Sequence, residues 1–189
     1  MPGDSHAGQP VILVIGDSLS AAYGIERQAG WVNLLQQRLS QKGYSYRVVN
    51  ASISGNTTRA GLARLPAALK QHKPAIVIIE LGGNDGLQGL SLNEFRNNLS
   101  RMTELAKKSN AKVLLCGVRI PPNLGLVYGS KFLGVYQEVS KKYQVPLVTY
   151  ILKGISDKSE LMQKDGVHPT AQGQPFILEN VWERLVKII

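Results

Sequence analysis

The sequence contains a single cysteine, which excludes an internal disulfide and any metal site built from several cysteines. Cys116 ends the apolar run 113–116, so we expect a small buried hydrophobic residue rather than a nucleophile. Histidine is scarce too, with three in the chain: His6, His72 and His168. Any chemistry that needs an imidazole therefore depends on one of these three positions.

Long apolar stretches are absent as well. The runs 11–15 and 76–79 are far shorter than the ~20 apolar residues that span a bilayer, so we expect no stable membrane insertion. Residues 1–10 form a polar N-terminal tail without the basic start and apolar stretch of a signal peptide. The tail fits either a cytoplasmic protein or a mature form whose leader has been removed.

Acidic residues are outnumbered, with 13 Asp and Glu against 22 Lys and Arg and a net charge of +9. Such an excess can attract nucleic acid or other anions. The basic residues are scattered, however, and no run of them alternates with aromatic residues, so we expect no nucleic-acid partner. The length and the 43% apolar composition fit one folded domain over residues 1–189.

Short β-rich runs alternate with stretches of helical period. Helical spacing is clearest for Leu92, Phe95 and Leu99. Continuous apolar runs are typical of parallel strands that helices cover on both faces. The sequence therefore predicts an α/β fold, a three-layer α/β/α sandwich with a mostly parallel five-stranded sheet. The predicted strands are 11–15, 46–49, 75–80, 112–117 and 145–149.

Polar, glycine-containing turns follow the first three predicted strands, at residues 16–20, 50–57 and 82–85. In open α/β sheets the ligand site lies beyond the carboxyl ends of the strands. We therefore expect these turns to meet on one rim of the sheet and to form the functional site.

Ser18 is the candidate nucleophile on this rim. It lies two residues after Gly16, directly behind the first strand, where it would stand exposed at the start of the following helix. The alternative is that Ser18 only caps that helix.

A serine nucleophile needs a base, and His168 is the best candidate. Gly166 permits a tight turn after Asp165, so the carboxylate can reach the imidazole three residues on, and Pro169 restricts the backbone of His168. Asp165 would then hold one ring nitrogen and stabilise the imidazolium. The alternative is an ordinary Asp-Gly turn beside a loop histidine.

Three groups could form an oxyanion hole for the negative charge that develops in acyl transfer. They are the backbone N–H of Ser18, the backbone N–H of Gly55 and the side-chain amide of Asn84. Asn84 also stands in a common turn sequence, Asn-Asp-Gly, which is its ordinary interpretation. Nucleotide-binding loops, the Gly-x-Ser-x-Gly elbow and zinc motifs are absent, so no cofactor and no metal are expected.

The segments 16–20, 82–85 and 165–169, with Gly55, resemble the four sequence blocks of the SGNH (GDSL) hydrolase superfamily, in the same order. The resemblance extends over residues 11–187 and is closest to the branch of bacterial thioesterase I, protease I and lysophospholipase L1. It implies a Ser18, Asp165 and His168 triad, with Gly55 and Asn84 as oxyanion donors. It also implies a flavodoxin-like strand order 2-1-3-4-5, hydrolysis of small acyl esters and thioesters, and a periplasmic location.

Two positions depart from that branch. Its members often carry an acidic residue where this chain has Asn56, and an asparagine where it has Thr170. Both flank predicted catalytic residues, so we expect them to affect relative activities more than the mechanism.

Two loops on the same rim are candidates for an acyl-chain groove. The segment 86–90 offers Leu87 and Leu90, each directly after a glycine, and could act as a flexible cover, while Ile120 and Pro121 follow the fourth predicted strand. The alternative is that these residues simply pack onto the core. We expect a monomer, since this fold closes its own core.

Rival functions make different predictions. A flavodoxin-like binding protein would hold a phosphate or nucleotide on the rim without any need for His168. A nucleic-acid-binding protein would show strongly salt-dependent binding and no reaction. A carbohydrate esterase would cleave acetyl but not octanoyl esters.

Overall fold

Five parallel strands form the central sheet of the computed structural model, which describes residues 8–189. Their order is β2-β1-β3-β4-β5, and every neighbouring pair is parallel. This arrangement confirms the predicted fold class and the strand order that the resemblance implied. The strands are β1 (Val11–Gly16), β2 (Arg47–Asn50), β3 (Ile76–Glu80), β4 (Lys112–Cys116) and β5 (Leu147–Val148).

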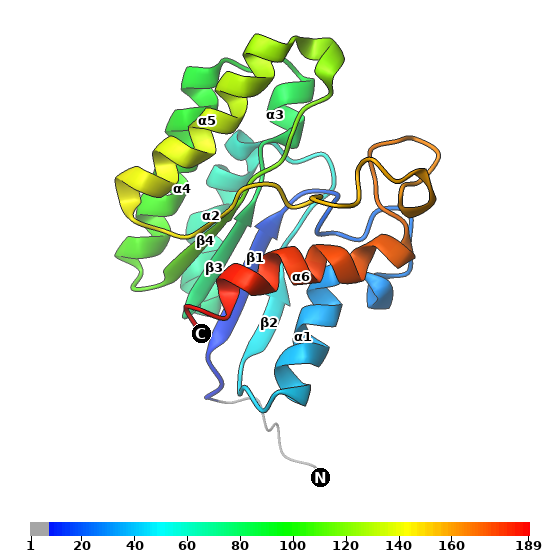
Figure 1. The fold of residues 1–189 in the computed structure, drawn as a ribbon. Coiled ribbons are helices and arrows are strands. Elements are labelled where there is room, and N and C mark those ends of the chain that lie inside the picture. The colour runs from blue at the N-terminus through cyan, green and yellow to red at the C-terminus, as the bar shows by residue number, and fades with distance from the viewer. Residues whose placement is uncertain (1–7) are drawn as a thin grey trace.

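Helices cover both faces of the sheet (Figure 1). On one face α1 (Trp31–Gln41) packs against α6 (Gln174–Leu185), and on the other α4 (Leu92–Lys108) packs between α2 (Thr58–His72) and α5 (Leu126–Tyr143). Both faces are therefore dry, and this explains why every residue of β1 and β3 is buried. A short helix, α3 (Gly83–Leu87), lies between β3 and α4.

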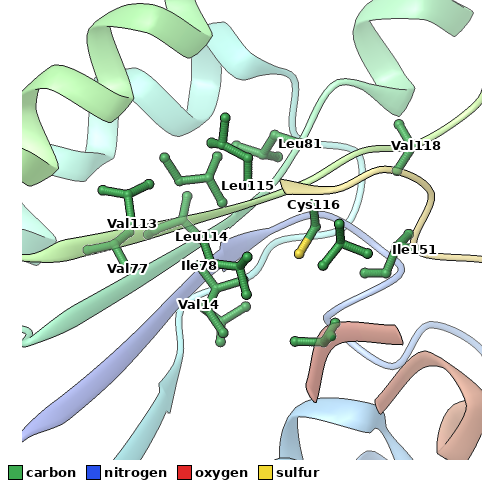
Figure 2. Packing of buried hydrophobic residues seen from close by; sticks show 14 of the residues in the cluster. Val14, Val77, Ile78, Leu81, Val113, Leu114, Leu115, Cys116, Val118 and Ile151 are labelled. Carbon is green, nitrogen blue, oxygen red and sulfur yellow. The ribbon is translucent and has the colours of Figure 1, made fainter. Parts of the chain in front are cut away.

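Cys116 belongs to the buried core, as predicted. Its side chain is fully buried, and Figure 2 shows it pointing to the opposite face of the sheet from Leu115. Burial raises the pKa of its thiol well above the usual range, which keeps the sulfur protonated and unreactive.

Side-chain hydroxyl groups cap the N-termini of two helices. The hydroxyl of Ser91 accepts a hydrogen bond from the N–H of Glu94 at 3.1 Å, which caps the N-terminus of α4. Thr57 caps α2 in the same way through the N–H of Ala60, at 3.3 Å. The cap at Thr57 places the start of α2 directly after the polar turn 50–57.

Two local expectations were wrong. Ser18 does not begin a helix: residues 18–24 form a series of turns, because Ala22 and Gly24 adopt left-handed backbone angles, with φ of 60° and 74°, that a helix cannot continue. The fifth strand is limited to Leu147–Val148, since Pro146 before it has no N–H to donate to a neighbour.

The sequence led us to expect no membrane-spanning segment, and the helices of the structure can be compared with that expectation. None of those between residues 8 and 189 is long and apolar enough to cross a bilayer. Residues 1–7 of the expected polar tail, with His6, lie outside the described residues.

Candidate active site

The three residues predicted to form a triad meet on the rim, although Ser18 is 150 positions away from His168. Nε2 of His168 lies 2.8 Å from Oγ of Ser18, and Nδ1 lies 2.6 Å from Oδ2 of Asp165. Serine, imidazole and carboxylate thus form one continuous hydrogen-bonded relay. Ser18 enters it from the turn behind β1, while the other two come from the loop that precedes α6.

The Asp165 carboxylate also builds the loop that carries the histidine. Its Oδ1 accepts hydrogen bonds from the N–H groups of Val167, at 2.9 Å, and His168, at 3.0 Å. Gly166 makes the tight turn directly after Asp165, with a φ of 67°. The hydrogen bond from the His168 ring, followed by these two backbone bonds, lowers the pKa of Asp165 to about 2, so the group stays ionised at neutral pH.

Two residues that the sequence analysis missed support the imidazole. The ring of Tyr23 lies against His168, with 4.4 Å between ring centroids. The side-chain amide of Gln163 donates to the carbonyls of Tyr23 and Pro169, at 2.8 and 3.0 Å. Its backbone N–H donates to the carbonyl of His168 at 2.7 Å. Gln163 therefore ties the histidine loop to the turn behind Ser18.

Of the predicted oxyanion donors, Ser18 and Asn84 line the pocket beside His168, whereas Gly55 lies on the loop after β2, next to Asn56, whose carbonyl accepts a hydrogen bond from Asn84. Among the described residues, no acceptor is bonded to the N–H of Ser18 or of Gly55, so both remain free for a substrate. Gly55 has a φ of 81°, which favours glycine, although a Cβ there would meet no atom within 4 Å. Nδ2 of Asn84 already bonds to Oδ2 of Asp17 at 3.1 Å and to the carbonyl of Asn56 at 3.0 Å, so an oxyanion would share one of its hydrogens.

A buried carboxyl pair lies beneath the turn of Ser18. The hydroxyl of Ser20 donates to Oε2 of the fully buried Glu80 at 2.7 Å, and the N–H of Asp17 lies 3.5 Å from the same oxygen. Burial, and then the charge of Asp17, raises the pKa of Glu80 well above its usual range. Burial also raises the pKa of Asp17 to about 6. Of the two carboxyl groups, Glu80 therefore keeps its proton more readily, and Asp17 more readily carries the negative charge that faces the amide of Asn84.

Arg64 of α2 holds the loop that carries Gly55. Its guanidinium donates to Oδ1 of Asn56 at 2.8 Å, to the carbonyl of Gly16 at 3.3 Å, and to the carbonyl of Ala51. Partial burial lowers the pKa of Arg64. With asparagine at position 56, this cation is held by neutral oxygen atoms rather than by a carboxylate.

A pocket of about 470 Å³ opens beside Ser18 and His168. Leu87, Ile120 and Pro121 line it, and their part in binding an acyl chain stays a prediction. Leu90 does not line it, and the expectation for this residue was wrong.

The reason lies in α3. Residues 83–87 are helical rather than a flexible loop, and the turn after the helix carries Leu90 away to where its carbonyl accepts a hydrogen bond from Tyr128 at 3.2 Å. Gly86 serves close packing, since a Cβ there would lie 2.2 Å from Cγ2 of Ile120.

Between residues 8 and 189, no three His, Cys, Asp or Glu side chains are grouped closely enough to hold an ion.

Residues 14–175 match the GDSL-like Lipase/Acylhydrolase family. The chain is 49% identical to esterase TesA of Pseudomonas aeruginosa over 184 residues, covering 97% of this chain and 92% of that protein. It is 40% identical to thioesterase 1/protease 1/lysophospholipase L1 of Escherichia coli over 183 residues, covering 97% and 86% of the two chains.

Solved structures agree. A crystal structure of TesA superposes with a TM-score of 0.93 at 50% identity, covering 95% of this chain and 99% of that one. The psychrotrophic esterase EstA from Pseudoalteromonas sp., in a structure inhibited by monoethylphosphonate, gives a TM-score of 0.90 at 38% identity, with 94% and 97% covered. The chain therefore belongs to the GDSL-like lipase/acylhydrolase family.

Proposed function

We propose that the protein hydrolyses acyl esters and thioesters through an acyl-enzyme on Ser18. The observation that carries this proposal is the relay from Ser18 through His168 to Asp165, placed at an apolar pocket. Several relatives are named esterase, arylesterase and thioesterase, which supports the same reaction class. By resemblance to the family we also expect a periplasmic location.

In the proposed mechanism, Oγ of Ser18 attacks the acyl carbonyl carbon while Nε2 of His168 takes the hydroxyl proton. The ionised Asp165 stabilises the imidazolium through Nδ1. As the intermediate collapses, the bond to the leaving alcohol or thiol breaks and His168 delivers the proton to it. Water then attacks the acyl-enzyme with the help of the same base, which releases the acid and restores Ser18.

The direct test is turnover of p-nitrophenyl esters and of an acyl thioester by the purified protein. We expect both to be cleaved, with release of the free acid. Absence of turnover across acetyl, butyryl and octanoyl substrates would remove the proposal in favour of a binding protein. Cleavage restricted to acetyl esters would favour a carbohydrate esterase instead.

The negative oxygen of the intermediate would lie against the N–H groups of Ser18 and Gly55 and the amide of Asn84. We expect Asn84→Ala to lower kcat by about 10²- to 10³-fold with little change in KM, because this interaction strengthens only as charge develops. Steady-state kinetics on p-nitrophenyl butyrate tests this. A change confined to KM would show that Asn84 binds the ground state rather than the oxyanion.

Leu87 is 50% exposed and lines the pocket, so it can cover part of a bound acyl chain. We expect Leu87→Gln to lower kcat/KM for octanoyl esters by about 10-fold and to leave acetyl esters almost unchanged, since only the long chain buries apolar surface there. Leu126→Gln is a matched control, because Leu126 is exposed but does not line the pocket. Equal losses for both chain lengths would assign Leu87 a structural role.

A further inference from the structure

The three predicted oxyanion donors come from separate parts of the chain. Ser18 follows β1, Gly55 lies on the loop after β2, and Asn84 belongs to α3. A tetrahedral intermediate needs its donors at hydrogen-bond distance from one oxygen atom, so small errors in their relative positions are costly. Contacts in the structure must therefore fix the three segments against one another.

The guanidinium of Arg64 bonds to both of the loops that follow β1 and β2. Its Nη2 donates to the carbonyl of Gly16 at 3.3 Å, on the turn that leads into the nucleophile. Its Nη1 donates to the carbonyl of Ala51, where the loop after β2 begins. Its Nε donates to Oδ1 of Asn56 at 2.8 Å, just before α2 starts. One planar group thus reaches three oxygen atoms on two loops.

Asn56 extends this link to the third donor. Its side chain is held by Arg64, while its backbone carbonyl accepts a hydrogen bond from Nδ2 of Asn84 at 3.0 Å. Its N–H donates to the carbonyl of Ile53 at 3.2 Å, which closes the turn that contains Gly55. Arg64 is therefore connected, directly or through one residue, to the segments that carry all three donors.

Arg64 differs from an ordinary surface arginine. Its side chain is half-buried, and among residues 8–189 no ion pair engages its guanidinium, which donates only to oxygen atoms of the two loops. Arg59, earlier on the same helix, is exposed and forms an ion pair with Glu94. The contacts of Arg64 therefore serve the loops of the site rather than the surface charge of α2.

We propose that Arg64 is a positioning residue whose guanidinium aligns the oxyanion donors of the three segments. The inference rests on the proposed function, because these donors act on the intermediate of that reaction. Arg64 is not among the described residues that line the pocket beside Ser18, so it acts through the donors and not on the substrate itself.

Arg64→Met keeps a long side chain and removes the guanidinium. We expect kcat for p-nitrophenyl butyrate to fall by about 10- to 100-fold with KM within about twofold, because misplaced donors weaken binding of the transition state more than of the substrate. Arg64→Lys should recover only a small part of this loss, since one ammonium group cannot replace a planar fork that reaches three oxygen atoms. Full recovery by lysine, or an unchanged kcat in Arg64→Met, would overturn the positioning role.

A double variant separates positioning from a general loss of stability. One of the aligned donors is already absent in Asn84→Ala, so adding Arg64→Met should lower kcat by a smaller factor than it does in the wild type. Losses that multiply in full would contradict the proposal. Arg59→Met is the matched control from the same helix, and we expect its kcat to stay within about twofold of the wild type. An equal loss in Arg59→Met would replace the specific role with an effect of the charge of α2.

Hydrogen exchange keeps the proposal testable if the wild type cleaves no ester. The loop of Gly55 is joined to the turn before Ser18 by the N–H of Ile53, which donates to the carbonyl of Gly16 at 3.0 Å. We expect the amides of residues 51–56 to exchange about 10-fold faster in Arg64→Met, with those of residues 65–72 unchanged. Faster exchange in a protein without turnover would reject the proposed reaction and support the positioning role. Unchanged exchange in residues 51–56 would reject that role.

Discussion

Ser18→Ala is expected to lower kcat for p-nitrophenyl butyrate by about 10⁴- to 10⁶-fold, because no other group could form the acyl-enzyme. The Ser18 hydroxyl is bonded to His168, and the hydrogen bond from the N–H of Tyr23 goes to the backbone carbonyl of Ser18, which the variant keeps. The folded structure should therefore survive, with a thermal midpoint within a few degrees of the wild type. Steady-state kinetics and a melting curve on the same preparation test both statements.

Ser52→Ala is the matched control for this experiment. Ser52 lies on the loop after β2, and its buried hydroxyl has no hydrogen-bond partner among the described residues. Removing it should leave kcat within about twofold and the stability almost unchanged. Activity that persists in Ser18→Ala, or an equal loss in both variants, would contradict a nucleophilic role for Ser18.

Asp165→Asn is expected to lower kcat by about 10²- to 10⁴-fold, through the tautomer of His168. The amide oxygen can still accept the N–H groups of Val167 and His168, which keeps the loop in place. The amide nitrogen then faces Nδ1 and donates to it, so the ring proton moves to Nε2. In that form Nε2 cannot accept the proton of Ser18, although the three side chains remain in position.

The effect should persist across pH. The pKa of Asp165 is about 2, so the wild-type carboxylate is ionised throughout an assay range above pH 4. The amide of the variant does not ionise in this range, so we expect that raising the pH will not restore the missing negative charge. Asp157→Asn is a suitable control because Asp157 is exposed and lies outside the pocket lining. Recovery of Asp165→Asn activity at high pH, or a loss of less than about 10-fold, would show that the carboxylate does not set the tautomer.

The sheet could be predicted from sequence because its strands are dry on both faces. Continuous apolar runs such as 11–15 and 76–79 have no alternation and sit between helical periods, which leaves few other arrangements. The order of the strands, by contrast, could not be predicted from periodicity and came from the family resemblance. Strand ends differ from the predicted ones by one or two residues, and Pro146, which has no N–H to donate, accounts for the late start of β5.

The candidate site was predictable where one short segment contains its own geometry. Asp165, Gly166 and His168 are close in sequence, and their spacing alone indicates a turn that joins carboxylate and imidazole. Tyr23 and Gln163 were missed because they act across 140 positions of sequence, through a contact that only folding creates. No local pattern marks either residue.

Leu90 shows the opposite failure. Its segment has the glycines and leucines typical of a mobile apolar loop, yet α3 uses Gly86 to pack against Ile120 and turns Leu90 away from the pocket. Glycine permits both flexibility and close approach, so its presence in a sequence does not decide between them. At Gly86 the side chain of Ile120 occupies the space where a Cβ would lie, so this glycine serves close packing.

The central claim is that Ser18 is a nucleophile activated by His168, and covalent trapping tests it most directly. A p-nitrophenyl alkylphosphonate should react once per chain, releasing one p-nitrophenol and adding one phosphonyl group, with esterase activity falling in proportion. Peptide mass spectrometry should place that group on Ser18, and His168→Gln should slow the labelling by about 10²-fold or more. Full inhibition with the label elsewhere, or full activity in stoichiometrically labelled protein, would contradict the account.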